Sequence, residues 1–119
     1  MRIDVNQRHG VTVVKPAGER LDLEVSVEFR ATLLRAITDG QRHLVVDLGD
    51  IEFVDSSGLG ALVSALKALR AQKDGDIRLA SLQPPVVALL EVTRLNRVFS
   101  SYATAEQAVQ SFGSPEGVA

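Results

Sequence analysis

The residues best suited to chemistry in this chain are two adjacent serines, Ser56 and Ser57, in the segment Asp-Ser-Ser-Gly at positions 55–58. An apolar run of strand length, residues 44–48, precedes the segment, and apolar residues at helical spacing follow it from about residue 57 to residue 72. A helix start leaves its first N–H groups without intrahelical partners and carries a partial positive charge. The two hydroxyls are therefore expected at a helix N-terminus, a position that stabilises a bound phosphate. Either serine could itself be phosphorylated there.

Two interpretations fit this segment. Serine and aspartate are common helix N-caps because their oxygens accept the unpaired N–H groups, so an ordinary cap explains residues 55–57. Gly58 and Gly60, however, fall in the first turn, where each costs on the order of 1 kcal/mol relative to alanine. Close packing on a sheet explains such small residues, and so does close approach of a partner. Gly60 and Ser64 lie off the leucine stripe of the helix, which favours a partner on that side.

The serines do not fit the arrangements expected of a catalytic nucleophile. A nucleophile elbow needs glycine two residues before and two residues after the serine, and neither Ser56 nor Ser57 has both. A P-loop is also absent, because residues 57–60 are not followed by Gly-Lys-Ser/Thr. His9 falls at an expected turn and His43 at an expected strand entry, so neither is placed as a general base. We therefore expect no catalytic residue, and a serine that is a substrate rather than a nucleophile.

Four aspartates are candidates for a site that binds a hard cation: Asp22, Asp47, Asp50 and Asp55. Carboxylate oxygens suit such ions, but the spacing is not that of a known ligand set, and caps and turns explain all four residues. The chain has no cysteine, which excludes disulfides, cysteine-based zinc sites and thiol catalysis. We expect neither a metal nor a cofactor.

The composition is that of a single soluble domain. A chain of 119 residues leaves little room for a second domain, and its 45% hydrophobic residues can fill a core. The formal charge is −2, and no Lys/Arg cluster offers a surface for nucleic acid or for anionic membranes. The amino end lacks the pattern of a signal peptide, and no stretch approaches the length of a membrane span. These features predict a cytoplasmic protein.

The order of predicted elements is that of an α/β protein. Residues 3–6 and 11–17 read as strands joined by a turn at His9 and Gly10. Further strands are expected at 44–48, 77–80 and 97–100, and helices at 23–37, 57–72, 86–93 and 105–112. Asp22, after a loop at 19–22, is the expected N-cap of the first helix. Alternation of strand and helix after the hairpin predicts a mainly parallel central sheet with about four helices.

The segment around the serines resembles the STAS domain family, in particular the bacterial anti-sigma-factor antagonists. The resemblance rests on residues 48–60, Leu-Gly-Asp-Ile-Glu-Phe-Val-Asp-Ser-Ser-Gly-Leu-Gly, which have the family's strand, turn and Asp-Ser-Ser-Gly motif before a helix. Three flanking segments match more weakly: 18–22 (Gly-Glu-Arg-Leu-Asp), 95–99 (Leu-Asn-Arg-Val-Phe) and 104–108 (Thr-Ala-Glu-Gln-Ala). The resemblance implies a STAS domain over residues 1–112, followed by a flexible tail at 113–119.

Membership of this family implies a partner-switching role in bacterial transcription and stress response. The unmodified antagonist binds an anti-sigma factor and frees a sigma factor. The anti-sigma factor, a serine kinase of the histidine-kinase-like ATPase type, then phosphorylates the first serine of the motif, here Ser56, with Ser57 as the second choice. Phosphorylation ends binding, and a serine phosphatase resets the system. The residues expected to bind the partner are Asp22, Asp55, Ser56, Ser57, Gly58, Leu59, Gly60 and Ser64.

Two other functions remain open on the sequence. One is a non-phosphorylated STAS adaptor or scaffold subunit of a larger signalling assembly or of a lipid-transport complex. The other is a nucleotide-binding domain, which the missing P-loop disfavours. Two departures from the family bear on partner choice: Arg20 is inserted before Asp22, and Arg94-Leu95 stands where the family often has Gly-Leu.

Overall fold

The computed structural model describes residues 2–113, which form an α/β domain. In chain order its elements are β1 (Ile3–Arg8), β2 (Val11–Pro16), β3 (Arg20–Leu21), α1 (Leu23–Thr38), β4 (His43–Asp47), β5 (Phe53–Val54), α2 (Ser56–Arg70), β6 (Asp76–Ala80), α3 (Pro84–Val92), the 3₁₀ helix η1 (Leu95–Arg97), β7 (Ser101–Tyr102) and α4 (Ala105–Ser111). Most of the tail predicted at 113–119 lies outside the described residues.

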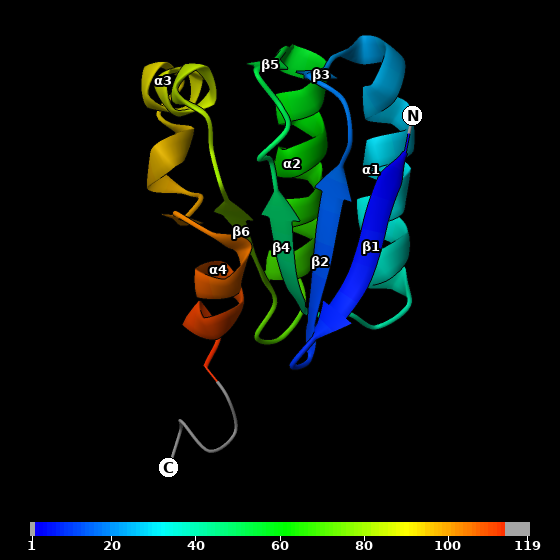
Figure 1. Ribbon diagram of the computed structural model, residues 1–119. Coiled ribbons are helices and arrows are strands. Elements are labelled where there is room, and N and C mark those ends of the chain that lie inside the picture. Colours follow the sequence, from blue (N-terminus) through cyan, green and yellow to red (C-terminus); the bar gives the residue numbers. More distant parts are fainter. Residues whose placement is uncertain (1, 114–119) are drawn as a thin grey trace.

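The central sheet has the strand order β1-β2-β4-β6-β7 (Figure 1). β1 and β2 form an antiparallel hairpin, and β2, β4, β6 and β7 pair in parallel. The hairpin turns at His9 (φ 52°) and Gly10 (φ 80°), and two successive positive φ values suit the twist of a two-residue hairpin loop. The predicted fold class, a mainly parallel sheet with an amino-terminal hairpin, is therefore confirmed.

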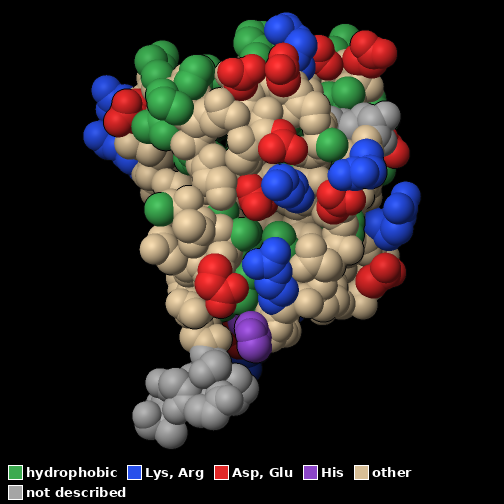
Figure 2. Space-filling model, in the orientation of Figure 1, with side chains coloured by type: hydrophobic (Ala, Val, Ile, Leu, Met, Phe, Trp, Pro, Cys, Tyr) green, Lys and Arg blue, Asp and Glu red, His purple; other side chains and the backbone are tan. Residues whose placement is uncertain are grey.

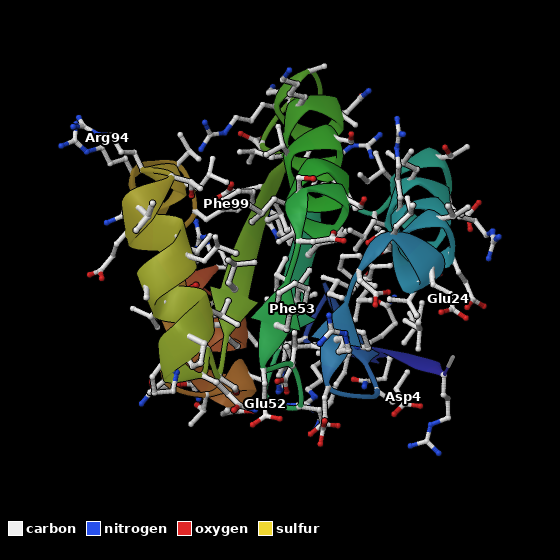
Figure 3. All side chains as sticks on the ribbon, turned by 90° about the horizontal axis from the view of Figure 1, so that it is seen from above. Asp4, Glu24, Glu52, Phe53, Arg94 and Phe99 are labelled. Atoms are coloured by element: carbon white, nitrogen blue, oxygen red, sulfur yellow. The ribbon has the colours of Figure 1, made fainter. Side chains whose placement is uncertain are left out.

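Helices cover both faces of this sheet. α1 and α2 lie side by side on one face and α4 lies on the other (Figures 1 and 3). The larger core cluster joins α1, α2 and α3 to the sheet and includes Phe29, Leu33 and Leu62. A smaller cluster beneath α4 contains Val45, Ala108 and Val109. Among residues 2–113, no helix combines the length and the hydropathy needed to cross a bilayer.

A second, two-stranded sheet lies at the carboxyl end of the central strands. β3 pairs in parallel with β5, with Arg20 beside Phe53 and Leu21 beside Val54. The N–H of Asp55 donates to the carbonyl oxygen of Leu21 at 3.2 Å, directly before α2 begins. The sequence predicted only a loop before Asp22 and no strand at β5, because two-residue strands show no alternation. This small sheet holds in place the backbone of residues 53–55, which leads directly into the serine segment.

The strand predicted at 97–100 is wrong. The chain forms η1 over Leu95–Arg97, and β7 follows at Ser101–Tyr102. The N–H groups of Val98 and Phe99 donate to the carbonyl oxygen of Leu95, so this stretch bonds to itself rather than to a neighbouring strand. The turn starts at Arg94, which has a φ of 62°. Glycine adopts that conformation freely, which accounts physically for the Gly-Leu pair often found there in the family.

Candidate functional site at the amino ends of α1 and α2

The Asp55 carboxylate connects the amino ends of two helices. Oδ1 accepts hydrogen bonds from the N–H groups of Ser57 (2.8 Å) and Gly58 (3.1 Å), which caps α2. Oδ2 accepts a hydrogen bond from the N–H of Leu23 (3.1 Å), the first residue of α1. The sequence identified Asp55 as part of a cap but did not predict that it reaches a helix that begins 32 residues earlier in the chain.

Asp22 does not provide the cap predicted for α1. It occupies the N-cap position, but its side chain makes no capping hydrogen bond. Its Oδ2 instead lies 3.4 Å from Nε of Arg20, whose guanidinium carbon lies 4.1 Å from the centre of the Phe53 ring. The prediction failed because Asp55 supplies the acceptor from another part of the chain. The inserted Arg20 thus joins Asp22 to the edge of the small sheet.

Replacing Asp55 by alanine is expected to lower the free energy of unfolding by about 2 kcal/mol, since each lost cap costs about 1 kcal/mol. Asp22→Ala is the matched control, and its loss should be below about 1 kcal/mol because it breaks only an exposed ion pair. Urea unfolding of the two variants measures the difference. Equal losses would show that the carboxylate of Asp55 does not stabilise both helices.

Ser56 and Ser57 differ in exposure. Ser56 is the first residue of α2 and is exposed, whereas Ser57 is half-buried and faces the groove between α1 and α2. The N–H groups of Ser57 and Gly58 already donate to Asp55. The helix start is therefore not the open anion site that the sequence indicated, since a carboxylate of the chain itself occupies it. An anion added to the Ser56 hydroxyl would meet that carboxylate.

The two glycines of the first turn have different roles. Gly58 is buried, and a Cβ there would lie 2.6 Å from the carbonyl oxygen of Leu21 and 2.8 Å from Cγ1 of Val54. Its small size thus serves close packing within the chain, one of the two reasons considered above. Gly60 is exposed, and a Cβ there would meet nothing within 4 Å. Only at Gly60, of these two glycines, does the missing side chain leave space at the surface for a partner.

The other predicted contact residues of α2 divide in the same way. Ser64 is half-buried in the groove between α1 and α2, on the same side as Gly60. Leu59 is half-buried and packs against the core cluster. Ala61 and Ala65, two further small residues of α2, are buried in the core.

Sequence reasoning missed two exposed apolar residues on α1. Leu23 is 67% exposed and Val27 is 71% exposed, and both line the groove next to Ser57. They lie one helical turn apart, so they face the same direction. The sequence carried a signal for this exposure: the apolar residues that recur at helical spacing here are 25, 29, 33, 36 and 37, and residues 23 and 27 lie outside that set. Exposed apolar residues that share one face of a helix are typical of a surface that binds another protein.

The remaining candidates lie in ordinary structural roles. Oδ1 of Asp47 accepts from the N–H of Gly49 at 2.9 Å, and Asp50 is exposed in the loop after β4. His43 stacks on Phe112 with ring centres 4.5 Å apart, and His9 lies in the hairpin turn. Within residues 2–113, His, Asp and Glu side chains form no group of three that could hold a metal ion.

Comparison with known proteins places this geometry in a family. The model of the STAS domain family matches residues 2–108. The anti-sigma F factor antagonist of Paenibacillus polymyxa is 33% identical over 103 residues, which are 86% of each chain. The anti-sigma-B factor antagonist of Staphylococcus aureus is 35% identical over 82 residues, 69% of this chain and 74% of that protein.

A solved structure agrees. The anti-sigma-factor antagonist (STAS) domain protein of Planctomyces limnophilus superposes with a TM-score of 0.84 and 30% identity, covering 93% of this chain and 97% of that chain. Fold, family model and relatives point the same way. The chain belongs to the STAS domain family, and it is similar to that family's anti-sigma factor antagonists.

Proposed function

We propose that this chain is an anti-sigma factor antagonist that works by partner switching. Its unmodified form binds an anti-sigma factor and thereby frees a sigma factor, and phosphorylation of Ser56 ends the binding. The partner is itself a serine kinase of the histidine-kinase-like ATPase type, and a serine phosphatase restores the unmodified form. The names of the relatives support a role as an anti-sigma factor antagonist, since both relatives carry that name.

The observation that carries the proposal is that Ser56 is exposed and lies next to the carboxylate of Asp55, which already accepts three backbone N–H groups. Phosphorylation adds about −1.5 to −2 charges and three acceptor oxygens. Asp55 already accepts the N–H groups of Ser57 and Gly58, so these two donors are not left for the new anion. It stays at the surface, close to a like charge. The fold is kept while the neutral hydroxyl of Ser56 becomes a strongly negative group on the contact surface.

In this proposal the chain is a substrate and a binding protein, not an enzyme, and it acts in the cytoplasm. His9 lies in the β1–β2 turn, and His43 begins β4, whereas Ser56 follows the other end of β4 and β5. Neither imidazole is thus placed to activate the serine as a nucleophile. Exposure of Ser56 instead suits access by a kinase.

Incubation with the cognate anti-sigma kinase and ATP is expected to add one phosphate to the chain, as measured by intact-mass analysis. Ser56→Ala should accept none. Ser57→Ala is the matched control and should accept one, because its half-buried hydroxyl is not the site. Full phosphorylation of Ser56→Ala would move the site to Ser57, and an unmodified wild-type chain would contradict the switch.

A second candidate is an adaptor in a larger assembly. Apolar side chains gather over α3 in Figure 2, where Val87 is 39% exposed and Val92 is 82% exposed. A surface of this kind is suited to a permanent contact. A stable high-order assembly of the purified chain in size-exclusion chromatography would favour this function over partner switching.

A further inference from the structure

We propose that the groove between α1 and α2 determines partner specificity: it receives one aliphatic side chain of the anti-sigma factor together with a neighbouring carboxylate. The identity of the partner rests on the proposed function. The chemistry of the occupant follows from the size of the groove, its apolar rim, a buried hydroxyl on its floor and a positive charge at its far end.

The groove has the size of a side-chain site. It encloses about 300 Å³ and opens beside Ser57, between the two helices whose amino ends Asp55 connects. Ligand pockets for small molecules run from about 300 to 1,000 Å³, so this groove is at the lower limit. Its lining includes Leu23, Ser26, Val27 and Arg30 of α1 and Gly60 and Ser64 of α2.

One rim of the groove is apolar and its opposite wall is open. Leu23 (67% exposed) and Val27 (71% exposed) stand one turn apart on α1. Across from them, the missing side chain of Gly60 leaves space in which a Cβ would meet nothing within 4 Å. An aliphatic side chain placed there would cover both apolar residues and remove them from water.

The floor of the groove holds an unpartnered hydroxyl. Ser26 is only 4% exposed, and among the described residues its Oγ has no hydrogen-bond partner. A serine inside a helix often bonds the carbonyl oxygen four residues earlier, but here that oxygen, on Asp22, accepts the N–H groups of Val25 and Ser26 instead. Buried polar groups are rarely left unpaired. The hydroxyl therefore favours an occupant that has a polar group beside its apolar part.

The far end of the groove carries a positive charge available for pairing. Arg30 lies one turn beyond Ser26, and its side chain lines the groove. The ion pairs found among residues 2–113 use Arg2, Arg8, Arg20 and Arg78, not Arg30. Charge complementarity therefore favours an occupant whose aliphatic side chain is followed closely by Asp or Glu.

The groove can be tested without the partner by ¹H–¹⁵N NMR titration with 4-methylpentanoate, which joins a leucine-sized group to a carboxylate. We expect saturable shifts at the amides of Ser26, Gly60 and Ser64 in the millimolar range. Gly60→Leu should weaken this binding at least about tenfold, whereas Ala88→Leu, which places the same side chain on exposed α3, should not. Arg30→Gln should remove the preference for the acid over its amide, 4-methylpentanamide.

A second measurement separates this inference from the proposed function. Gly60→Leu should weaken binding of the anti-sigma kinase at least about tenfold, and Ala88→Leu should not. If phosphorylation of Ser56 ends binding but Gly60→Leu binds as the wild type does, the groove inference fails and the function stands. If the probe binds in the groove but no anti-sigma factor binds the chain, the function fails. Absence of saturable shifts, or shifts unchanged in Gly60→Leu, overturns the inference by itself.

Discussion

Replacing Gly58 by alanine is expected to lower the free energy of unfolding by about 3 kcal/mol, at the upper end of the cost of adding a methyl group to a packed site. The same change at Gly60 is expected to raise it by roughly 0.5–1 kcal/mol, since alanine is the better helix former and restricts the unfolded chain. The two glycines are two residues apart in one helix, so they form a matched pair.

The difference arises from what the added Cβ would contact. At Gly58 it would lie 2.6 Å from the carbonyl oxygen of Leu21, which is backbone and is held by the N–H of Asp55. Relief of that contact requires β3 to move away from α2. At Gly60 the new methyl group would point into open space.

Urea unfolding of both variants, with the wild type alongside, measures these effects. A loss at Gly60→Ala comparable with that at Gly58→Ala would show that the first turn, rather than the contact with Leu21, determines the cost. A Gly58→Ala chain as stable as the wild type would show that β3 can move away from α2 at little cost in free energy. Either result would remove the packing account of Gly58.

Replacing Ser56 by aspartate is expected to weaken binding of the anti-sigma factor by about 2–5 kcal/mol, because a buried charge without a partner is costly at an interface. This corresponds to roughly 30-fold to several thousand-fold in Kd. The new carboxylate stands beside Asp55, whose oxygens already accept three N–H groups. Ser56→Ala keeps the neutral surface and should bind as the unmodified chain does.

A charge-matched control separates local repulsion from a general effect of net charge. Gln107→Glu adds one carboxylate at an exposed position of α4, on the opposite face of the central sheet. Its Kd should equal that of the wild type, measured by calorimetry under the same salt conditions. If Ser56→Asp binds as tightly as the wild type, or if Gln107→Glu is weakened equally, the site of the switch is wrong.

Local pattern was sufficient for most of the fold and for the helix start that carries the serine segment. The apolar spacing of residues 23–37 and 57–72 matches α1 and α2 within two residues at each end. The nearly continuous apolar run at 44–48 corresponds to β4, a buried strand with neighbours on both sides. The serine segment does begin a helix, with Asp55 as its cap. Each of these features depends on residues that are close together in the sequence.

Features that depend on distant residues were not predictable. Asp55 rather than Asp22 accepts the N–H of Leu23, because the pairing of β3 with β5 brings the two helix ends together. The same pairing buries Gly58 against Leu21, so its small size reflects packing inside the chain. Strands of two residues carry no alternation, and they were therefore missed.

The carboxyl-terminal error has a different cause. The apolar pair Val98 and Phe99 suggested a strand, but Phe99 is buried by a short helical turn that brings it into the core. Arg94 starts that turn in a left-handed conformation, which a sequence pattern does not predict for arginine. The last strand, β7, which pairs with β6, begins only at Ser101.

The measurement that tests the central claim most directly compares the two forms of the chain against one anti-sigma factor. The chain phosphorylated at Ser56 and the unmodified chain would be titrated by calorimetry, with backbone amide shifts recorded for both. We expect the phosphorylated form to bind at least about 100-fold more weakly, with shift changes confined to residues near 55–61. Equal Kd values for the two forms would contradict partner switching through Ser56, and shifts spread through the sheet would contradict a purely electrostatic switch.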